Sequence, residues 1–235
     1  IFLAIKFLNI YIIPDRMQFI RVVLSNELLN NLFLLFCLLV LINGSNFIDG
    51  LNGLSSGYYL LVIISILVIE KYFNFNLENN DFSSILFSPL LIFFLFNLFN
   101  KNFMGDNGIY FLSFYIGINL IETFNANIFY LSPFYIASLL WYPAFENLFS
   151  IIRRLNFSKS ISSPDNLHLH ALLFNKLKSR INKKNSNSIT SLIILFFSLP
   201  GFFFSTIYHN ETIILCLIIM FNTFLYLISY QYLKK

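Results

Sequence analysis

Charged residues are scarce in this sequence. Lys, Arg, Asp and Glu make up only 11% of its 235 residues, whereas hydrophobic residues make up 57%. A soluble domain of this size carries roughly a quarter charged residues, because its surface must face water. The sequence has too little polar material to cover such a surface, which excludes a soluble fold with a very large core. The composition instead predicts an integral membrane protein.

Cysteine is almost absent as well. The two cysteines, Cys37 and Cys216, lie inside apolar runs, where we interpret them as buried small hydrophobic residues. They do not form the spaced set that a disulfide framework requires. The sequence also lacks the basic start, short apolar stretch and small-residue cleavage site of a secretory signal peptide. Because the chain begins with Ile instead of Met, we expect it to be the later part of a longer protein.

Long apolar runs are what the sequence has in abundance. A helix that crosses the bilayer needs about 20 mostly apolar residues, with a range of about 17–25. Seven runs meet or approach this length, so we predict an all-α, polytopic membrane helix bundle that forms a single domain over residues 1–235. The predicted spans lie near residues 28–45, 55–70, 84–100, 107–122, 131–150, 188–207 and 212–232.

Basic residues are distributed unequally between the two sides of this predicted bundle. Eleven Lys and Arg fall on one side, eight of them in the predicted loop 151–187, and four fall on the other side. Loops rich in Lys and Arg stay in the cytoplasm, so this basic loop is predicted to be cytoplasmic in a multi-pass protein of the bacterial plasma membrane. A basic loop that faces anionic lipid explains the net charge of +4 without a nucleic-acid partner.

Three polar stretches interrupt the apolar sequence, and all three fall on the predicted cytoplasmic side. They are INGSNFIDGLNGLSSG at 42–57, NKNFMGDNG at 100–108 and SSPDNLHLHALL at 162–173. The predicted sidedness rests on Lys and Arg alone, whereas these stretches are marked by acids, glycines and histidines. Their agreement therefore indicates a common site on the cytoplasmic face.

Asp49 is the single acid of the first stretch. Asn46, Asp49, Asn52 and Gly53 are spaced three to four residues apart, which places them on one helical face. The glycines allow the backbone to approach a ligand closely, and the carboxylate can bind a cation or accept a proton. The alternative is a helix cap followed by a tightly packed interface of small residues.

Asp106 lies between Gly105 and Asn107, just before a predicted span. Taken alone, it is explained as an N-cap residue. Together with Asp49 on the same side of the membrane, it suggests a site for a hard cation such as Mg²⁺, which binds one or two carboxylates and the phosphate oxygens of a substrate. Mn²⁺ is the alternative ion.

His168 and His170 are two of the three histidines in the chain. At a spacing of two they share a face only in an extended or irregular segment, and with Arg153 and Arg154 they suit phosphate binding. A zinc pair and two solvated loop histidines are the alternatives. Zinc is disfavoured because the sequence offers no nearby Cys and no helical His-x-x-x-His pattern. The third histidine, His209, falls on the opposite side and is predicted to have no part in the site.

Glu146 is an acid inside the predicted span 131–150. An ionisable residue at membrane depth is a candidate functional residue. It lies eight residues before Arg154, so a structural ion pair with the arginines and a catalytic role both stay open.

These stretches, taken in order, resemble the motifs of one family. NGSNFIDGLNGLSSG resembles the pattern Asn-x-x-Asn-x-x-Asp-Gly-x-Asp-Gly-Leu-x-x-Gly, and NFMGDNG resembles Phe-(Leu/Met)-Gly-Asp-x-Gly. PAFENLFSIIRRL followed by SSPDNLHLHALL resembles Pro-x-x-Asp…Arg-Arg…Ser-Pro-Asp-x-x-His-x-His-His. The family is the polyprenyl-phosphate N-acetylaminosugar-1-phosphate transferases, which include the phospho-N-acetylmuramoyl-pentapeptide transferase. The similarity runs from Asn43 to Leu173.

The resemblance implies a membrane enzyme that transfers a sugar-1-phosphate from a UDP-sugar to a polyprenyl phosphate such as undecaprenyl phosphate. UMP is released, and Mg²⁺ is the implied cofactor. The resemblance further implies that Asp106 binds the metal, that Asp49 lines the nucleotide and catalytic cleft, and that His168 and His170 contact the phosphates. We expect these four residues to be catalytic and Asp49 to share the metal with Asp106. Whether the protein forms a homodimer is left open by the sequence. We expect substrate contacts from Asn46, Asn52, Gly53, Asn107, Arg153 and Arg154.

The sequence departs from the family pattern at four points. The second Asp of the first motif is Asn52, the last His of the third is Ala171, and Glu146 stands where the family often has Asp. The upstream Asp-Asp pair of the family has no counterpart in residues 1–42, so we expect an N-terminally truncated chain. The changes at 52 and 171 favour the branch that builds surface glycans such as the O-antigen of lipopolysaccharide, over peptidoglycan of the cell wall. The alternative function is a transporter or a scaffold that binds the lipid carrier without catalysis.

Overall fold

The computed structural model describes residues 1–7, 10–12, 21–22, 24–73, 82–156, 167–179 and 183–234. Within these ranges the regular secondary structure is entirely helical, as predicted for an all-α protein. The helices are α1 (Phe2–Phe7), α3 (Glu27–Ile48), α4 (Leu54–Phe73), α5 (Phe82–Leu98), α6 (Gly105–Ala126), α7 (Pro133–Leu139), α8 (Trp141–Asn156), α9 (Leu169–Lys178), α10 (Lys183–Ile207) and α11 (Thr212–Lys234).

The predicted apolar runs form the long helices of the bundle. Large apolar side chains are exposed along the outer helices, such as Phe196 and Phe203 on α10 and Ile213 and Met220 on α11. Apolar surface of this extent indicates contact with lipid. The chain is therefore a multi-pass membrane protein, as predicted. Four stretches of the described part are long and apolar enough to cross a membrane: Glu27–Ile48, Leu54–Tyr72, Ser186–Ile207 and Thr212–Lys234.

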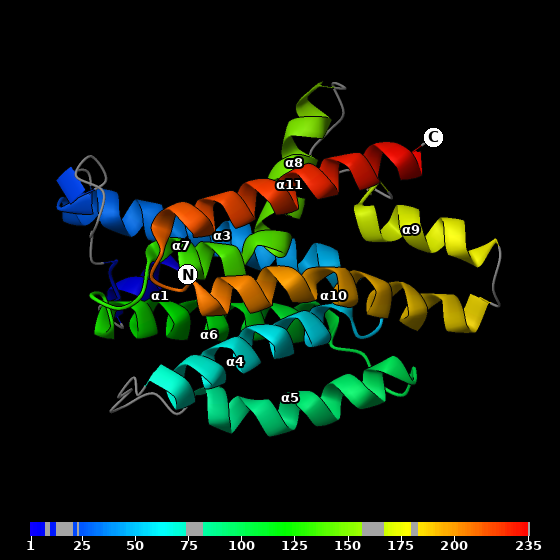
Figure 1. The fold of residues 1–235 in the computed structure, drawn as a ribbon, viewed down its shortest axis with the longest axis horizontal. Coiled ribbons are helices and arrows are strands. Elements are labelled where there is room, and N and C mark those ends of the chain that lie inside the picture. Colours follow the sequence, from blue (N-terminus) through cyan, green and yellow to red (C-terminus); the bar gives the residue numbers. More distant parts are fainter. Residues whose placement is uncertain are drawn as a thin grey trace.

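The long helices lie side by side, and one end of the bundle gathers most of the polar stretches. In Figure 1, α3, α4, α5, α6, α10 and α11 run roughly along the long axis of the molecule, whereas α8 rises steeply out of this layer. α4 packs on α5 and α10, and α3 packs on α6 and α8. The C-terminal ends of α3 and α5 and the N-terminal ends of α4, α6 and α10 lie at the end that also holds α9 (Figure 1). We call it the α9 end.

The predicted span 131–150 is not a single helix, which corrects the expectation from the sequence. It consists of α7 and α8, which meet at Leu140. Residue Pro143 has no N–H, so the carbonyl of Leu139 has no helical partner four residues along the chain. The buried hydroxyl of Tyr58 donates to this carbonyl at 2.9 Å and accepts from the N–H of Tyr142 at 3.2 Å. Tyr58 therefore satisfies backbone groups that an apolar interior would otherwise leave unpaired.

α8 leaves this break by crossing α3 at close range. Gly44 lies at the crossing, where an added Cβ would overlap the backbone carbonyl of Pro143. The side-chain amide of Asn147 donates to the carbonyl of Val40 at 3.1 Å. These two contacts fix the position of α8, which carries Glu146 and the arginine pair.

The segment 151–187 is predicted as a loop, but its described part is largely helical. Residues 151–156 continue α8, residues 169–178 form α9, and α10 begins at residue 183. Leu169, Leu172 and Leu173 pack against the main core at a spacing of three and four residues, which is the apolar face of a short helix. The surrounding basic residues obscure this face in the sequence.

We expect Gly44→Ala to destabilise the protein by about 2–3 kcal/mol, because the new methyl group would push α8 away from α3 and strain the break at Leu140. Thermal unfolding of the purified protein in detergent measures the effect. The matched control is Gly108→Ala in α6, where an added Cβ meets only the flexible side chain of Met104. Equal melting temperatures for the two variants would contradict this account of the crossing.

Candidate active site

The last turn of α3 is the centre of the candidate site. α3 ends at Ile48, and the N–H of Asp49 still donates to the carbonyls of Ser45 and Asn46. The chain then turns into α4 through Gly53, whose φ of +82° is readily adopted only by glycine. Because the chain reverses here, the last residues of α3 and the first residues of α4 lie together at the α9 end.

Asp49 is half-buried beside the start of α4. The hydroxyl of Ser55 donates to its carboxylate. Burial raises the pKa of Asp49 to about 6; the hydrogen bond from Ser55 opposes this rise, and the negative charge of Asp106 adds to it. The structure thus brings the two predicted acids into electrostatic contact. The alternative of a tight small-residue interface also holds for the start of α4, where a Cβ on Gly57 would collide with the side chain of Leu195.

Asp106 lies in the first turn of α6 and is exposed. The alternative of an N-cap residue is wrong, because the cap position of α6 is Met104. The side-chain amide of Asn46 donates to Asp106 Oδ1 at 3.0 Å, which joins the last turn of α3 to the first turn of α6. Asn107 is exposed next to Asp106. The substrate contacts of Asn46 and Asn107 stay predictions.

Asparagine side chains hold the two loops around Asp49 together. The side-chain amide of Asn52 donates to Asn100 Oδ1 at 2.6 Å, and the N–H of Asn52 donates to Asn187 Oδ1 at 2.9 Å. Asn52 is therefore a bridge between the loop after α3, the loop after α5 and the start of α10. Its predicted contact with substrate stays a prediction.

Asn97 in α5 holds Gly53, the residue after Asn52, in a similar way. Its side-chain oxygen accepts from the N–H of Gly53, and its side-chain nitrogen donates to the carbonyl of Asn102 at 2.7 Å. Gly53, another predicted substrate contact, is thus fixed from α5. The sequence analysis missed this asparagine network, because asparagine is frequent throughout the chain and no spacing distinguishes these positions.

His168 and His170 are both buried, which rules out the alternative of solvated loop histidines. Their rings stack with centroids 5.5 Å apart and an interplanar angle of 8°. The ring of Phe47 in α3 lies 4.8 Å from the ring of His168, and a Cβ on Gly50 would lie 3.2 Å from His170 Nε2. The end of α3 therefore contacts the histidine pair as well as Asp106.

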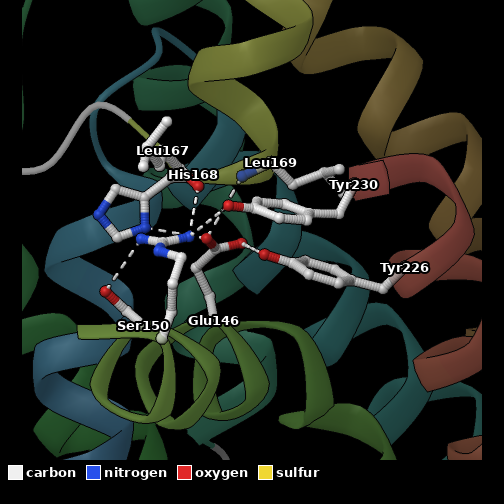
Figure 2. A network of polar contacts seen from close by, with 8 residues as sticks. Glu146, Ser150, Leu167, His168, Leu169, Tyr226 and Tyr230 are labelled. Atoms are coloured by element: carbon white, nitrogen blue, oxygen red, sulfur yellow. Dashed lines mark hydrogen bonds and ion pairs between the residues drawn. The ribbon is translucent and has the colours of Figure 1, made fainter. Parts of the chain in front are cut away.

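Glu146 is fully buried and connects His168 to two helices (Figure 2). Its Oε1 lies 2.9 Å from His168 Nδ1 and 3.4 Å from the N–H nitrogen of Leu169. Its Oε2 accepts from the hydroxyl of Tyr226, on α11, at 2.8 Å. Because a carboxylate occupies Nδ1, Nε2 is the ring nitrogen of His168 that can serve a ligand. The sequence singled out Glu146 but left its partner open.

Arg153 supports the chain immediately before His168. Its guanidinium donates to the carbonyl of Leu167 at 2.5 Å and to the hydroxyl of Tyr230 at 3.3 Å, and it lies over the rings of Phe149 and Tyr230. Figure 2 shows Leu167, His168 and Leu169 beside Tyr226 and Tyr230 of α11. Arg154 is also buried. The predicted substrate contacts of both arginines stay predictions.

The donor set at the end of α3 suits a hard divalent cation. Asp49 and Asp106 provide only oxygen, and Mg²⁺ or Mn²⁺ takes one or two carboxylates when phosphate oxygens and water supply the rest. Zinc needs at least three protein ligands, typically nitrogen or sulfur. No group of three or more His, Cys, Asp or Glu placed to hold a metal ion occurs among the described residues, so the zinc alternative has no support there.

The protonation of His170 makes the stability of the site depend on pH. Burial lowers the pKa of His170 to about 4, with Glu146 opposing the shift and His168 adding to it. Since an unfolded histidine titrates near pH 6.5, the stability tied to neutral His170 is complete above that pH and is lost as the pH falls toward 4. Between pH 7 and pH 5 the loss amounts to about 2 kcal/mol. We expect the His170→Gln variant not to show this loss of stability, because glutamine does not titrate in this pH range.

Thermal unfolding of both proteins in detergent at pH 7 and pH 5 tests this expectation. Asp49 acts in the opposite direction: its pKa of about 6, against 3.8 normally, adds stability as the pH falls through 6. Asp49 is present in both proteins, so the difference between them isolates His170. Parallel pH dependence in the two proteins would contradict a neutral, buried His170.

Comparison with known proteins shows which sequences this chain is similar to. The chain is 30% identical over 187 residues to the undecaprenyl-phosphate alpha-N-acetylglucosaminyl 1-phosphate transferase of Thermotoga maritima, which covers 77% of this chain and 55% of the relative. It is 29% identical over 184 residues to the probable undecaprenyl-phosphate N-acetylglucosaminyl 1-phosphate transferase of Bacillus subtilis, over 76% of this chain and 48% of the relative. The decaprenyl-phosphate N-acetylglucosaminephosphotransferase of Mycolicibacterium smegmatis is 30% identical over 153 residues, 55% of this chain and 37% of the relative.

The chain spans about half the length of the curated relatives it matches, from 37% to 55% of the three named here. No solved structure matches it. The family model described as glycosyl transferase family 4 matches residues 1–124, which is more than half of the 235 residues. The chain therefore belongs to glycosyl transferase family 4.

Proposed function

We propose that this protein transfers N-acetylglucosamine-1-phosphate from its UDP-sugar to a polyprenyl phosphate such as undecaprenyl phosphate, with release of UMP. One observation carries the proposal: the last turn of α3 contacts both Asp106 and the buried histidine pair. The relatives support it, because their names specify N-acetylglucosamine 1-phosphate transfer and undecaprenyl or decaprenyl phosphate.

In this reaction an oxygen of the lipid phosphate attacks the sugar-bearing phosphorus of the UDP-sugar. The new P–O bond forms the lipid diphosphate sugar. The P–O bond to the bridging oxygen breaks, and this oxygen leaves with UMP. Several negative charges meet in one cleft, so the protein must position the two phosphates and stabilise their charge.

The residues at the end of α3 suit these tasks. Asp106, with Asp49 beside it, would hold Mg²⁺ or Mn²⁺, which supplies positive charge to the phosphate oxygens when bound. Asn46 orients Asp106 through its side-chain amide. His168, whose Nδ1 is held by Glu146, can donate from Nε2 to a phosphate oxygen when both ring nitrogens carry a proton.

We place the site on the cytoplasmic face of a bacterial plasma membrane, where a nucleotide sugar is available. The excess of Lys and Arg in and around residues 151–187 supports this orientation. The product would be the first lipid-linked sugar of a cell-surface glycan.

Asp106→Asn should reduce UMP release at least about 100-fold, because the amide keeps the shape of the side chain but removes the charge that holds the cation. The assay supplies UDP-N-acetylglucosamine, undecaprenyl phosphate and Mg²⁺ to membranes that contain the protein and measures UMP. Glu27→Gln, at the opposite end of α3, is the matched control and should retain full activity. Parent-level turnover by Asp106→Asn would refute the metal-binding role, and lipid-independent UMP release by the parent would refute the transfer reaction.

Glu146→Gln should reduce turnover by about 10–100-fold while leaving the KM for the UDP-sugar almost unchanged. The carboxylate positions His168 and does not reach the substrate, so its loss alters the histidine and spares nucleotide binding. Nitrogen NMR of labelled histidine should show a changed tautomer for His168. Glu211→Gln, at the far end of the bundle, is the control. A large rise in KM with an unchanged His168 spectrum would show that Glu146 acts on the substrate directly.

A further inference from the structure

A cavity whose lining includes neither Asp49 nor Asp106 lies within the helix bundle. It has a volume of about 470 Å³ and lies between α10 and α11, with walls from α4, α7, α8 and α9. Its lining is mainly apolar and aromatic, and includes Tyr58, Trp141, Ile194, Phe202, Leu225 and Tyr226. A volume of this size is within the range of about 300–1,000 Å³ that is typical of ligand sites.

The cavity is elongated along the helices. It follows α11 from Asn222 to Leu233 and α10 from Ile193 to Phe202, which is about 16 Å and about 14 Å at 1.5 Å per residue. One leaflet of a bilayer contributes about 15 Å of hydrocarbon. The cavity therefore has the length of a single lipid chain in one leaflet.

The two ends of the cavity differ. Figure 1 shows α10 and α11 diverging from their short connection, with α9 between their far ends. At the narrow end, Gly201 comes so close to α11 that an added Cβ would lie 2.9 Å from the side-chain nitrogen of Asn222. At the α9 end, Leu173 and Tyr232 line the cavity. We therefore place the entrance for an apolar chain at the α9 end, where α10 and α11 have diverged.

A positively charged side chain, that of Lys176, lies at this entrance. The ammonium of Lys176, on α9, lies 3.9 Å from the centroid of the Tyr232 ring, which itself lines the cavity. Lys178, two residues further along α9, instead lies 5.9 Å from the centroid of the Phe174 ring, which does not line the cavity. An apolar slot one leaflet long with a lysine at its mouth is complementary to an anionic lipid, with the chain inside and the phosphate outside.

We propose that the cavity between α10 and α11 binds one acyl chain of an anionic phospholipid, whose phosphate is held at Lys176. This site is distinct from the place where the polyprenyl phosphate would react, because its volume suits one acyl chain and not a carrier of many isoprene units. It still touches the catalytic network, since Tyr226 both lines the cavity and donates to Glu146. The bound lipid therefore packs against Tyr226, whose hydroxyl donates to Glu146, the residue that positions His168.

The chain itself provides a probe for this site. Trp141 is its only tryptophan, and it lines the cavity. The indole N–H donates to Thr223 at 3.0 Å, which places Trp141 nine residues, or about 13 Å, deeper along α11 than Tyr232. Bromine atoms on a lipid chain quench tryptophan fluorescence on contact. Bromines far down the acyl chain should therefore quench Trp141 more strongly than bromines near the headgroup.

The test titrates the purified protein in detergent with brominated phosphatidylglycerol and, separately, brominated phosphatidylcholine. We expect phosphatidylglycerol to reach half-maximal quenching at a concentration about fivefold lower, and Lys176→Gln to remove this preference. Lys178→Gln, two residues further along α9, is the matched control and should keep most of the preference. Ser198→Phe, which fills the cavity from α10, should abolish quenching by both lipids.

Three outcomes would overturn the proposal. The first is equal quenching by the two lipids in the parent protein, which would mean that the headgroup is not recognised. The second is undiminished quenching in Ser198→Phe, which would place the bromines outside the cavity. The third is loss of quenching on addition of stoichiometric undecaprenyl phosphate, which would assign the cavity to the lipid carrier. None of these readouts depends on transfer activity, so the proposed reaction can fail while this proposal stands.

Discussion

The carbonyl of Leu139 sets the architecture of the candidate site. In a continuous helix it would accept from the N–H of residue 143, but that residue is proline and has none. In an apolar interior an unpaired carbonyl costs several kcal/mol, about as much as a large core mutation. The hydroxyl of Tyr58 donates to this carbonyl and also accepts from the N–H of Tyr142. With these groups paired, α7 can end and α8 can begin in a new direction. A continuous helix along the axis of α7 would not take residues 146–153 across α3.

The direction of α8 determines what Glu146 and Arg153 can reach. α8 crosses α3 where Gly44 permits backbone contact, so that its next turns lie beside residues 167–169. One face of α8 then supplies both supports of the histidine segment: Glu146 at His168 and Arg153 at Leu167. α11 completes the arrangement through the hydroxyls of Tyr226 and Tyr230. His168 is thus held by long-range contacts, whereas His170 lies in the first turn of α9.

The sequence predicted the parts of this site that depend on local pattern. Apolar runs located the helices, and the acids at 49 and 106 with the histidines at 168 and 170 were correctly expected at one end of the bundle. Hydropathy could not reveal the break at Leu140, because the runs on both sides of it are apolar and the decisive hydroxyl comes from Tyr58, more than eighty residues away in sequence. For the same reason the partner of Glu146 was found among the histidines only when α8 and α9 were placed in space.

The asparagine network gives a physical reason for one departure from the family pattern. Asn52 occupies a position where the family has a second aspartate, and its amide donates to Asn100 Oδ1. An aspartate carboxylate is acceptor-only when ionised and could not make this hydrogen bond. It would also add a third negative charge beside Asp49, whose pKa is already raised by burial and by Asp106. With asparagine at 52, 97 and 100, the loops are fixed by neutral amides. The two remaining carboxylates then carry the negative charge of this end of α3, which suits a site that must also admit anionic phosphates.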